Sequence, residues 1–264
     1  MTYFDEKVIW ITGASSGIGE ALVYAFAKTN AKLVLSSRKI HDLERVLNSA
    51  KVNVERVLLL PMDLEHFENM NDFANKVIDK FERIDVLINN AGLSQRGLAK
   101  NTHVSIDERL MKVNYFGTIA LTKTVLPLMM DQGFGTIATV TSAVGKFGSP
   151  WRSGYAASKH ALHGFFDSLR AEIFENNIKV LLICPGFVNT NVSINALDET
   201  GNPLNIMDSA TENGLDPNYV AKKILKAISE GKEEIFIGGF KEYLGLLMKR
   251  FFPTLFSIMV RKRL

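Results

Sequence analysis

Short runs of uninterrupted apolar residues alternate along the chain with longer stretches in which apolar residues recur at helical spacing. The short runs are rich in β-branched residues and leucine, and they predict strands at 8–12, 32–37, 57–63, 86–89, 136–142, 179–184 and 234–238. The longer stretches predict helices, among them 17–29, 67–82, 105–130 and 155–175. Strands that are apolar throughout are covered on both faces, and their alternation with helices is typical of a parallel sheet. The pattern therefore predicts a doubly wound α/β fold, the Rossmann fold.

Two segments depart from this alternation, and the first is residues 187–215. This segment is rich in Asn, Asp, Ser, Thr and Gly and is too long for an ordinary connection. We interpret it as a lid over a site at the carboxyl ends of the strands, with a disordered excursion as the alternative. No repeat, low-complexity segment or linker divides the chain, so we expect residues 1–239 to form one domain.

The second departure is residues 240–264, which we interpret as an amphipathic helical tail. Six of its residues are Lys or Arg, and only Glu242 is acidic. Its apolar surface is supplied by Tyr243, Leu247, Phe251, Phe252, Leu255, Phe256 and Met259. The longest uncharged run, 251–260, is too short to span a bilayer. The tail could pack on its own subunit, pack on a neighbouring subunit or the substrate entrance, or lie in a membrane surface. Pro253 interrupts the continuous face that a membrane-surface helix needs, so we favour contact with protein.

Composition narrows the function classes. The chain has 264 residues, 47% of them apolar, which argues against disorder and allows a large core. Its formal charge of +3 is too small to indicate a nucleic-acid partner. The first residues include acidic rather than basic side chains and predict no signal peptide, so we expect a cytoplasmic protein. Cys184 is the only cysteine, and its apolar surroundings predict a buried thiol.

A glycine-rich turn, "TGASSGIG" at 12–19, joins the first predicted strand to the first predicted helix. Backbone amides at a helix N-terminus can face a pyrophosphate, and the helix dipole favours its negative charge. Gly13 permits the tight turn, Gly17 lets the backbone approach phosphate, and Gly19 permits close helix packing. Glycines are common in turns, so it is the position between strand and helix that favours a dinucleotide site. The residues predicted to bind the cofactor here are Gly13, Ser15, Ser16, Gly17, Ile18 and Gly19.

The end of the second predicted strand distinguishes NAD from NADP. An acidic residue there would bond the ribose 2′-hydroxyl of NAD. This chain has Ser37 and Arg38 instead, and a guanidinium suits a 2′-phosphate. The pattern favours NADP(H), and a solvated surface arginine is the alternative.

Tyr155 and Lys159 stand one helical turn apart in "YAASK", at the start of a predicted helix. Most Tyr–Lys pairs at this spacing are packing and surface residues. A cation held beside a phenol would instead lower the tyrosine pKa and provide an acid/base group at neutral pH. The preceding strand ends at Ser142, and the carboxyl ends of parallel strands line one crevice. Ser142 and Tyr155 are therefore expected to lie together.

Taken together, these motifs resemble the short-chain dehydrogenase/reductase family in its single-domain branch. The resemblance runs from Lys7 to about Gly239. It rests on "TGASSGIG" (12–19), "NNAG" (89–92), Asn114 in "VNYFG", Ser142 in "VTSAVG", "YAASK" (155–159) and "PGFVNT" (185–190). Each motif is modest alone, and their order makes the set specific. The stretch 154–172 and the tail look most similar to members related to 11β-hydroxysteroid dehydrogenase.

The resemblance implies roles for four catalytic residues. Tyr155 would be the general acid that protonates a carbonyl oxygen as hydride arrives, or the base in the reverse direction. Lys159 would bond the nicotinamide ribose and lower the Tyr155 pKa. Ser142 would donate a hydrogen bond to the substrate oxygen, and Asn114 would hold a water that links Lys159 to solvent.

The resemblance also extends the cofactor site and implies an oligomer. The implied contacts are Asp63 and Leu64 to adenine, Asn90, Ala91 and Gly92 to the adenosine ribose, and Pro185, Gly186, Val188 and Thr190 to nicotinamide. Several have structural alternatives, since Asp63 could cap a helix and Pro185–Gly186 could be a plain turn. Family members usually form dimers or tetramers, so we expect a homodimer or a homotetramer.

No metal site is predicted. The five histidines are scattered, and His160 and His163, three apart on a helix, have neither Cys nor an acid arranged beside them in the sequence.

The sequence thus predicts an NADP(H)-dependent oxidoreductase that interconverts a ketone or aldehyde with a secondary or primary alcohol. Phe147, Trp151 and Phe187 flank the expected site and favour an apolar substrate, although they could equally be core. The alternative is an NADP(H)-binding regulatory protein without turnover, which would have no need to keep Tyr155 and Lys159. An epimerase or dehydratase of the family's longer branch is disfavoured by the glycine spacing and by the lack of a sizeable C-terminal substrate domain.

Overall fold

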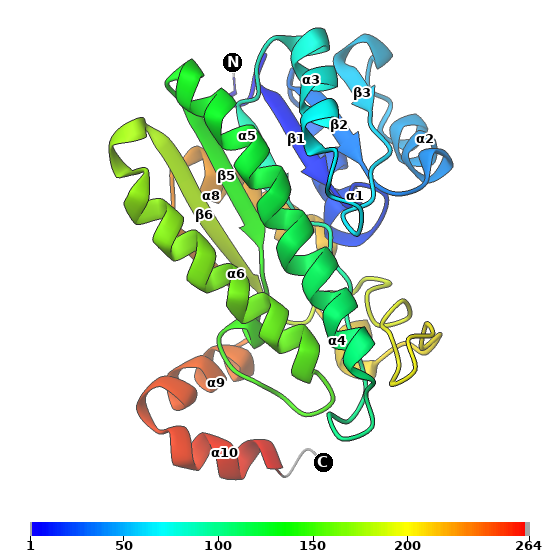
Figure 1. The fold of residues 1–264 in the computed structure, drawn as a ribbon, viewed down its shortest axis with the longest axis vertical. Helices are drawn as coiled ribbons and strands as arrows, with labels where there is room; N and C mark the ends of the chain where they lie inside the picture. The colour runs from blue at the N-terminus through cyan, green and yellow to red at the C-terminus, as the bar shows by residue number, and fades with distance from the viewer. Residues whose placement is uncertain (1, 262–264) are drawn as a thin grey trace.

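The computed structural model describes residues 2–261 and consists of a seven-stranded parallel sheet with helices on both faces (Figure 1). The strands are β1 (Val8–Thr12), β2 (Lys32–Ser36), β3 (Val57–Leu59), β4 (Val86–Asn89), β5 (Gly135–Val140), β6 (Ile178–Pro185) and β7 (Glu234–Ile237). Their order across the sheet is β3-β2-β1-β4-β5-β6-β7. The predicted doubly wound α/β fold is confirmed, and each predicted strand position is occupied by a strand.

Helices cover both faces of the sheet. Because successive residues of a strand point to opposite faces, each strand contributes apolar side chains to both buried layers. In β1, Ile9 and Ile11 belong to one hydrophobic core, while Val8 and Trp10 belong to the other. The first core is covered by α1 (Gly17–Phe26), α2 (Ile40–Ala50) and α8 (Pro217–Ser229). The second is covered by α3 (Met70–Phe81), α5 (Thr118–Gln132) and α6 (Ser153–Glu172). This two-sided burial is what the uniformly apolar strand sequences require.

The predicted helix at 105–130 is interrupted in the structure. It consists of α4 (Val104–Met111), a π-helical turn (Lys112–Gly117) and α5. π-helical turns are rare in proteins overall, and many of those that interrupt an α-helix lie at functional sites. Here it contains Asn114, whose side chain is fully buried beside the site described below.

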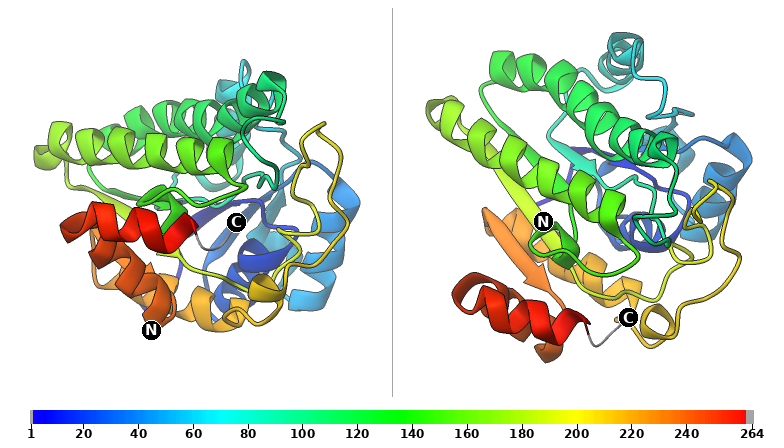
Figure 2. Two further views of the ribbon diagram at one scale, coloured as in Figure 1. Left: turned by 90° about the horizontal axis from the view of Figure 1, so that it is seen from below. Right: turned by 60° about the horizontal axis from the view of Figure 1, so that its bottom comes forward.

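The chain reverses direction across the sheet between β1 and β4, which begin the two halves of the strand order. In doubly wound sheets ligands bind in the crevice at this point, outside the carboxyl ends of the strands. Residues 187–215, including the short helix α7 (Ser209–Glu212), lie over the same edge (Figures 1 and 2). The fold therefore gathers the loops after β1, β4, β5 and β6 at one place.

The last described helices, α9 (Phe240–Phe251) and α10 (Pro253–Arg261), form an L beyond the ends of β5 and β6 (Figure 1). Phe256 is 6% exposed and packs edge-on against Phe147, with ring centroids 5.3 Å apart. Other apolar side chains of these helices are open to solvent, notably Phe240, Phe251 and Phe252. Among residues 2–261, no helix combines the length and apolar character needed to cross a bilayer. The tail thus packs in part on its own subunit and leaves a second apolar face exposed.

Candidate active site

The glycine-rich turn after β1 is held in a shape that a side chain would block. Gly13 and Gly17 have φ values of +65° and +55°, a region that residues with a Cβ rarely adopt. A Cβ on Gly19 would lie 2.0 Å from the carbonyl oxygen of Gly13. The turn therefore folds closely on itself and brings the N-terminus of α1 to the crevice, where its free amides can bind an anion.

The neighbouring loop after β4 is attached to this turn by Thr12. The Thr12 hydroxyl accepts hydrogen bonds from the backbone amides of Asn90, at 3.0 Å, and Ala91, at 3.1 Å. In return, Asn90 Nδ2 donates to the Thr12 carbonyl at 3.0 Å. The loops after β1 and β4 therefore form one rigid wall.

A single pocket brings most of the predicted residues together. Those that line it are Gly13, Ser16, Gly17, Ile18, Asn90, Ala91, Gly92, Ser142, Tyr155, Lys159, Pro185, Gly186, Val188 and Thr190. Arg38 and Asp63 line a second hollow, next to His66 and Asp72. Ser15, Gly19, Ser37, Leu64 and Asn114 line neither. The predicted nicotinamide end and adenine end thus occupy two separate depressions of the surface.

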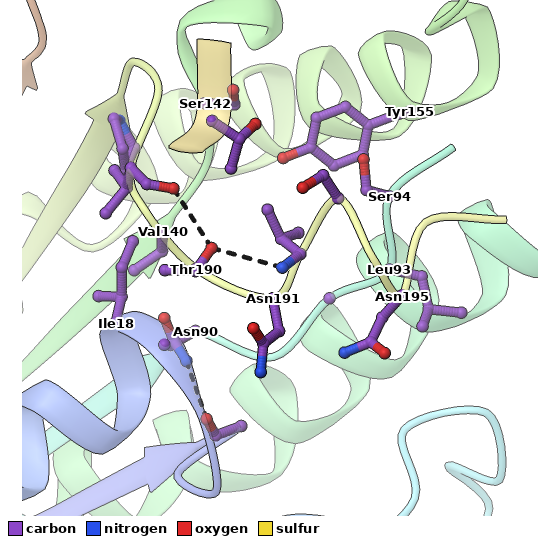
Figure 3. Close-up of a pocket in the computed structure, with 18 of the residues that line it drawn as sticks. Ile18, Asn90, Leu93, Ser94, Val140, Ser142, Tyr155, Thr190, Asn191 and Asn195 are labelled. Atoms are coloured by element: carbon purple, nitrogen blue, oxygen red, sulfur yellow. Dashed lines mark hydrogen bonds between the residues drawn. The ribbon is translucent and has the colours of Figure 1, made fainter. Parts of the chain in front are cut away.

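Ser142 and Tyr155 lie next to each other on one side of this pocket, and Asn90 lies on the other (Figure 3). Ser142 follows the end of β5, and its Oγ accepts a 3.3 Å hydrogen bond from the amide of Val144. Tyr155 stands in the first turn of α6; burial raises its pKa, and hydrogen bonding with Ser142 partly offsets this rise. The expected meeting of Ser142 and Tyr155 is confirmed.

Lys159 lies one turn further along α6 and is 4% exposed. Its Nζ donates a 2.9 Å hydrogen bond to the carbonyl of Val140 at the end of β5. Burial lowers its pKa to about 8. A Cβ on Gly92 would lie 3.4 Å from Lys159 Nζ and 3.1 Å from Asn114 Oδ1, so the absence of a side chain at Gly92 leaves room for both groups.

The charges that act on Tyr155 are not those the sequence predicted. Burial raises the Tyr155 pKa above its ordinary value, and this is partly offset by the nearby guanidinium of Arg152, by Ser142 and by the guanidinium of Arg96. Lys159 Nζ lies 5.9 Å from the centre of the Tyr155 ring and bonds to backbone instead. Two arginines that the sequence argument missed therefore supply positive charge near Tyr155, and the expected effect of Lys159 on the Tyr155 pKa stays a prediction.

Asn114 is fully engaged by the protein beneath the pocket. Its Oδ1 accepts from the amide of Leu93 at 2.7 Å, while its Nδ2 donates to the Leu93 carbonyl and to Ser158 Oγ, each at 2.9 Å. These bonds fix the loop after β4 against α6. The structure therefore gives Asn114 a positioning role, and its predicted contact with a water stays a prediction.

A cluster of charged residues that sequence reasoning missed lies at the edge of the pocket. Arg96 pairs with Asp208 of the 187–215 segment, and Arg152 lies 3.9 Å from the same Asp208 oxygen. Both arginines line the pocket beside Tyr155. Their positions carried a signal, since Arg96 lies four residues after "NNAG" and Arg152 three residues before Tyr155. Their partner Asp208 lies far away in a polar loop, where no motif marks it.

Of the three aromatic residues expected to flank the site, only Phe187 lines the pocket. The guanidinium of Arg152 stacks over its ring, with the guanidinium carbon 5.2 Å from the ring centre. Phe147 instead packs on the tail through Phe256, and Trp151 is 39% exposed outside the pocket. Of the three aromatic residues on which the expectation of an apolar substrate rests, only Phe187 lies where it could contact a substrate.

The fold brings a cysteine of β6 and an acid of β7 to His163, although neither stands beside it in the sequence. Cys184 Sγ lies 3.8 Å from His163 Nε2, and Glu234 Oε2 lies 4.0 Å from His163 Nδ1. These three residues are a group of metal-type ligands, although Lys146 already pairs with Glu234 at 2.7 Å. Cys184 is 1% exposed, as predicted, and burial raises its pKa to about 11.

Comparison with known sequences gives a consistent family assignment. A family model described as short chain dehydrogenase matches residues 7–200. The dehydrogenase/reductase SDR family protein 7-like of Anopheles gambiae is 41% identical, over 99% of this chain and 84% of that protein. Dehydrogenase/reductase SDR family member 7B of Danio rerio is 37% identical, over 98% and 86%. These relatives are not named 11β-hydroxysteroid dehydrogenases, so that narrower resemblance stays a prediction.

Solved structures share the fold and differ in the dinucleotide they hold. A short-chain dehydrogenase/reductase from Burkholderia phymatum in complex with NAD has a TM-score of 0.80 at 25% identity, over 89% of this chain and 90% of that one. A short-chain dehydrogenase from Burkholderia cenocepacia in complex with NADP has a TM-score of 0.81 at 22% identity, over 98% and 99%. The fold therefore accommodates either dinucleotide.

Proposed function

This chain belongs to the short-chain dehydrogenase/reductase family, and we propose that it is an NADP(H)-dependent oxidoreductase that interconverts a ketone or aldehyde with a secondary or primary alcohol. Tyr155 is the general acid in the reduction and the general base in the oxidation. The observation that carries the proposal is the convergence of Ser142, Tyr155 and Lys159 with the glycine-rich turn on one pocket.

The residues of the pocket fit a dinucleotide. The α1 N-terminus offers free backbone amides for a pyrophosphate, and a Cβ on Gly17 would fill the space in front of Thr190, 3.0 Å from its methyl carbon. The rigid wall of Asn90, Ala91 and Gly92 would hold the ribose side, and Pro185, Gly186 and Val188 the nicotinamide side. When bound, NADPH supplies the hydride, and the protein supplies orientation and electrostatics.

The chain's own groups handle the proton. In the reduction, the Tyr155 hydroxyl gives its proton to the carbonyl oxygen as the alcohol forms, and its raised pKa keeps that proton in place at neutral pH. Ser142 donates a hydrogen bond to the same oxygen and stabilises its developing negative charge. Lys159 is a buried cation fixed to Val140, placed to bond the ribose of the cofactor.

NADP(H) is proposed over NAD(H) because of Arg38. Arg38 is exposed at the loop after β2 and shares its hollow with Asp63, which the family resemblance places at the adenine. A guanidinium at that position supplies bidentate hydrogen bonds to a 2′-phosphate.

A panel of ketones and aldehydes incubated with NADPH tests the proposal. We expect NADPH absorbance to fall with at least one compound, and the thermal unfolding midpoint to rise when NADPH is added. Binding of NADPH without oxidation across the panel would contradict turnover and favour the regulatory alternative. Among panel members that carry the same polar and charged groups, those with the larger apolar part should react best if Phe187, Leu93 and Val192, which line the pocket, contact the substrate.

We further propose that the chain forms a homodimer or homotetramer and that the exposed face of α9 and α10 contacts another subunit. Phe240, Phe251 and Phe252 are 79%, 68% and 60% exposed, more than a helix pair normally leaves in water. Deletion of residues 241–264 should lower the mass in solution measured by light scattering. If instead the mass is unchanged and only the full chain sediments with anionic vesicles, the tail contacts membrane.

A further inference from the structure

Three separate segments meet beside Tyr155 and bring two arginines into the substrate end of the pocket. The backbone of Gln95 pairs with that of Leu197, and Gly97 pairs with Arg152, through isolated parallel bridges. Arg96 lies between these two attachments, and its own amide donates to the Leu197 carbonyl at 2.8 Å. The loop after β4 is thus tied to the 187–215 segment on one side and to the start of α6 on the other.

The cluster has two positively charged side chains and only one negatively charged side chain. Arg96, Arg152 and Asp208 have side chains that are 16%, 12% and 25% exposed. The Asp208 carboxylate pairs with Arg96 and also caps α7 through its other oxygen, which accepts from the amides of Ala210 and Thr211. Two guanidiniums therefore share one carboxylate in a mostly buried place, where an uncompensated charge is costly.

Arg152 is the member without a close partner. Within residues 2–261 its guanidinium makes no hydrogen bond, and its one ion pair is the 3.9 Å contact with Asp208. Burial lowers its pKa to about 10, so it still carries its charge at neutral pH. Trp151, directly before it, has a φ of +60°, a backbone conformation that residues with a Cβ rarely adopt.

The two arginines face the pocket, and their shared acid does not. Arg96 and Arg152 line the pocket together with Ser142 and Tyr155, whereas Asp208 lies outside it. Phe187 packs under the Arg152 guanidinium and leaves its edges, which carry the N–H donors, available. An acceptor with two oxygens that entered beside Tyr155 would meet these donors directly.

We propose that Arg152, assisted by Arg96, binds an anionic oxygen group of the carbonyl substrate, a carboxylate or a phosphate. This inference rests on the proposed function and names the class of substrate that the site accepts. The ketone or aldehyde lies at Tyr155, and the anionic group lies at the arginine pair at the other end of the same molecule. Such an anion supplies the hydrogen bonds and the charge that Arg152 lacks in the protein alone.

The dinucleotide phosphates do not account for the arginine pair. The pyrophosphate site is the α1 N-terminus near Gly17, and the candidate 2′-phosphate site is Arg38 in the separate hollow. Arg96 and Arg152 instead adjoin Tyr155, where the family resemblance places the substrate.

Matched pairs of compounds test the subsite. One arm compares short oxo acids, with different spacings between ketone and carboxylate, against their methyl esters. A second arm compares phosphorylated hydroxyketones against the unphosphorylated compounds. The measurement is the ratio of kcat/KM for the anionic member to that for its neutral match, with NADPH saturating. For the wild type we expect a ratio of roughly 10 to 100 in at least one pair, as charge-assisted hydrogen bonds allow.

Two variants should change this kcat/KM ratio in opposite directions, and a control variant should leave it unchanged. Arg152→Gln should lower it roughly tenfold or more, because the neutral amide cannot hold the anion. Asp208→Asn should raise it, because it removes the competing charge and keeps an oxygen to cap α7. Arg109→Gln removes an arginine that pairs with Glu65 at 3.1 Å outside the pocket, and it should leave the ratio unchanged.

The outcomes separate the subsite from other roles of Arg152. If Arg152 served only to hold the fold or to adjust the Tyr155 pKa, Arg152→Gln would slow both members of each pair equally, and the unchanged ratio would overturn the proposal. A wild-type ratio near one across both arms would do the same while leaving the oxidoreductase function intact. If no compound is reduced, the proposed function fails, and calorimetric binding of the same oxo acids to the NADP⁺-loaded protein decides the subsite. Equal binding by wild type and Arg152→Gln then counts against it.

Discussion

The pocket has two halves that are built in different ways. One half, proposed to bind the nucleotide and called the nucleotide half, consists mainly of backbone: Gly13 and Gly17 at positive φ, the N-terminal amides of α1, and a wall fixed by the Thr12 hydroxyl. The other half, proposed to bind the substrate and called the substrate half, consists of side chains, above all Arg96 and Arg152, from segments more than 50 residues apart in the sequence. A site formed by the backbone requires only that side chains be absent at certain positions, so the same nucleotide site can be combined with many different substrate sites. A site formed by side chains depends on which charged groups come together, so it distinguishes one substrate class from another.

Tyr155 stands at the boundary between the halves, and its removal should have the largest effect. Tyr155→Phe keeps the ring and deletes the proton donor, so kcat should fall about 10²- to 10⁴-fold. The affinity for NADPH, measured by fluorescence titration, should stay within a few-fold of wild type if the nucleotide half is independent. Tyr115→Phe is the matched control, since Tyr115 packs against Phe165 away from the pocket. Near-native turnover of Tyr155→Phe would remove Tyr155 from the chemistry.

Addition of a single methyl group at Gly19 should disrupt the nucleotide half. In Gly19→Ala the new Cβ would meet the Gly13 carbonyl oxygen at 2.0 Å, so the turn must shift. We expect a loss of about 1–3 kcal/mol in the free energy of unfolding and at least tenfold weaker NADPH binding, measured by denaturant titration and fluorescence.

Gly164→Ala provides the control for that substitution. Gly164 also lies in a helix, but no atom lies within 4 Å of its missing Cβ. The exchange should stabilise α6 by about 0.5–1 kcal/mol, since alanine favours a helix interior. If both variants bind NADPH like wild type, the close fold of the turn is not what holds the cofactor.

The contrast between the halves also explains how far the sequence could predict the molecule. The strands, the parallel order and the glycine-rich turn follow from local patterns, because uniform apolar runs and glycine spacing act over a few residues. The substrate half does not, because Asp208 reaches Arg96 across 112 positions and only the fold brings them together. The same limit applies to His163, whose neighbours Cys184 and Glu234 come from β6 and β7. Its motif identified Asn114 in the sequence. Its bonds to Leu93 and Ser158 depend on the π turn, which the sequence pattern did not predict.

One side chain in the second hollow, outside this pocket, should decide the cofactor. Arg38→Asp would repel a 2′-phosphate and offer an acceptor to a 2′-hydroxyl, so the ratio of kcat/KM for NADPH to that for NADH should fall roughly 10- to 100-fold. Lys28→Asp makes the same change of charge at an exposed position beyond α1 and should leave the ratio alone. An unchanged ratio in Arg38→Asp would mean that another group binds the phosphate.

The last expected effect concerns a charge that the protein interior between α6, β6 and β7 excludes. His163 lies on α6 two turns after Tyr155, is 7% exposed, and is surrounded by Cys184, Lys146 and Glu234. Burial, with a smaller contribution from the Lys146 charge, lowers its pKa to about 4, against 6.5 for an unperturbed histidine. Between these values the unfolded chain binds more protons than the folded one, so stability is lost as the pH falls through this window.

His163→Leu tests this point, because leucine fills similar space without binding a proton. Denaturant unfolding should give similar free energies for variant and wild type at about pH 7.5, where the imidazole is neutral in both states. At about pH 4.5 the wild type should have lost on the order of 2 kcal/mol more than the variant. The larger loss belongs to the wild type because only its folded state must exclude a proton that its unfolded state binds. An identical acid loss in both proteins would place the pH sensitivity elsewhere and exclude His163 as its source.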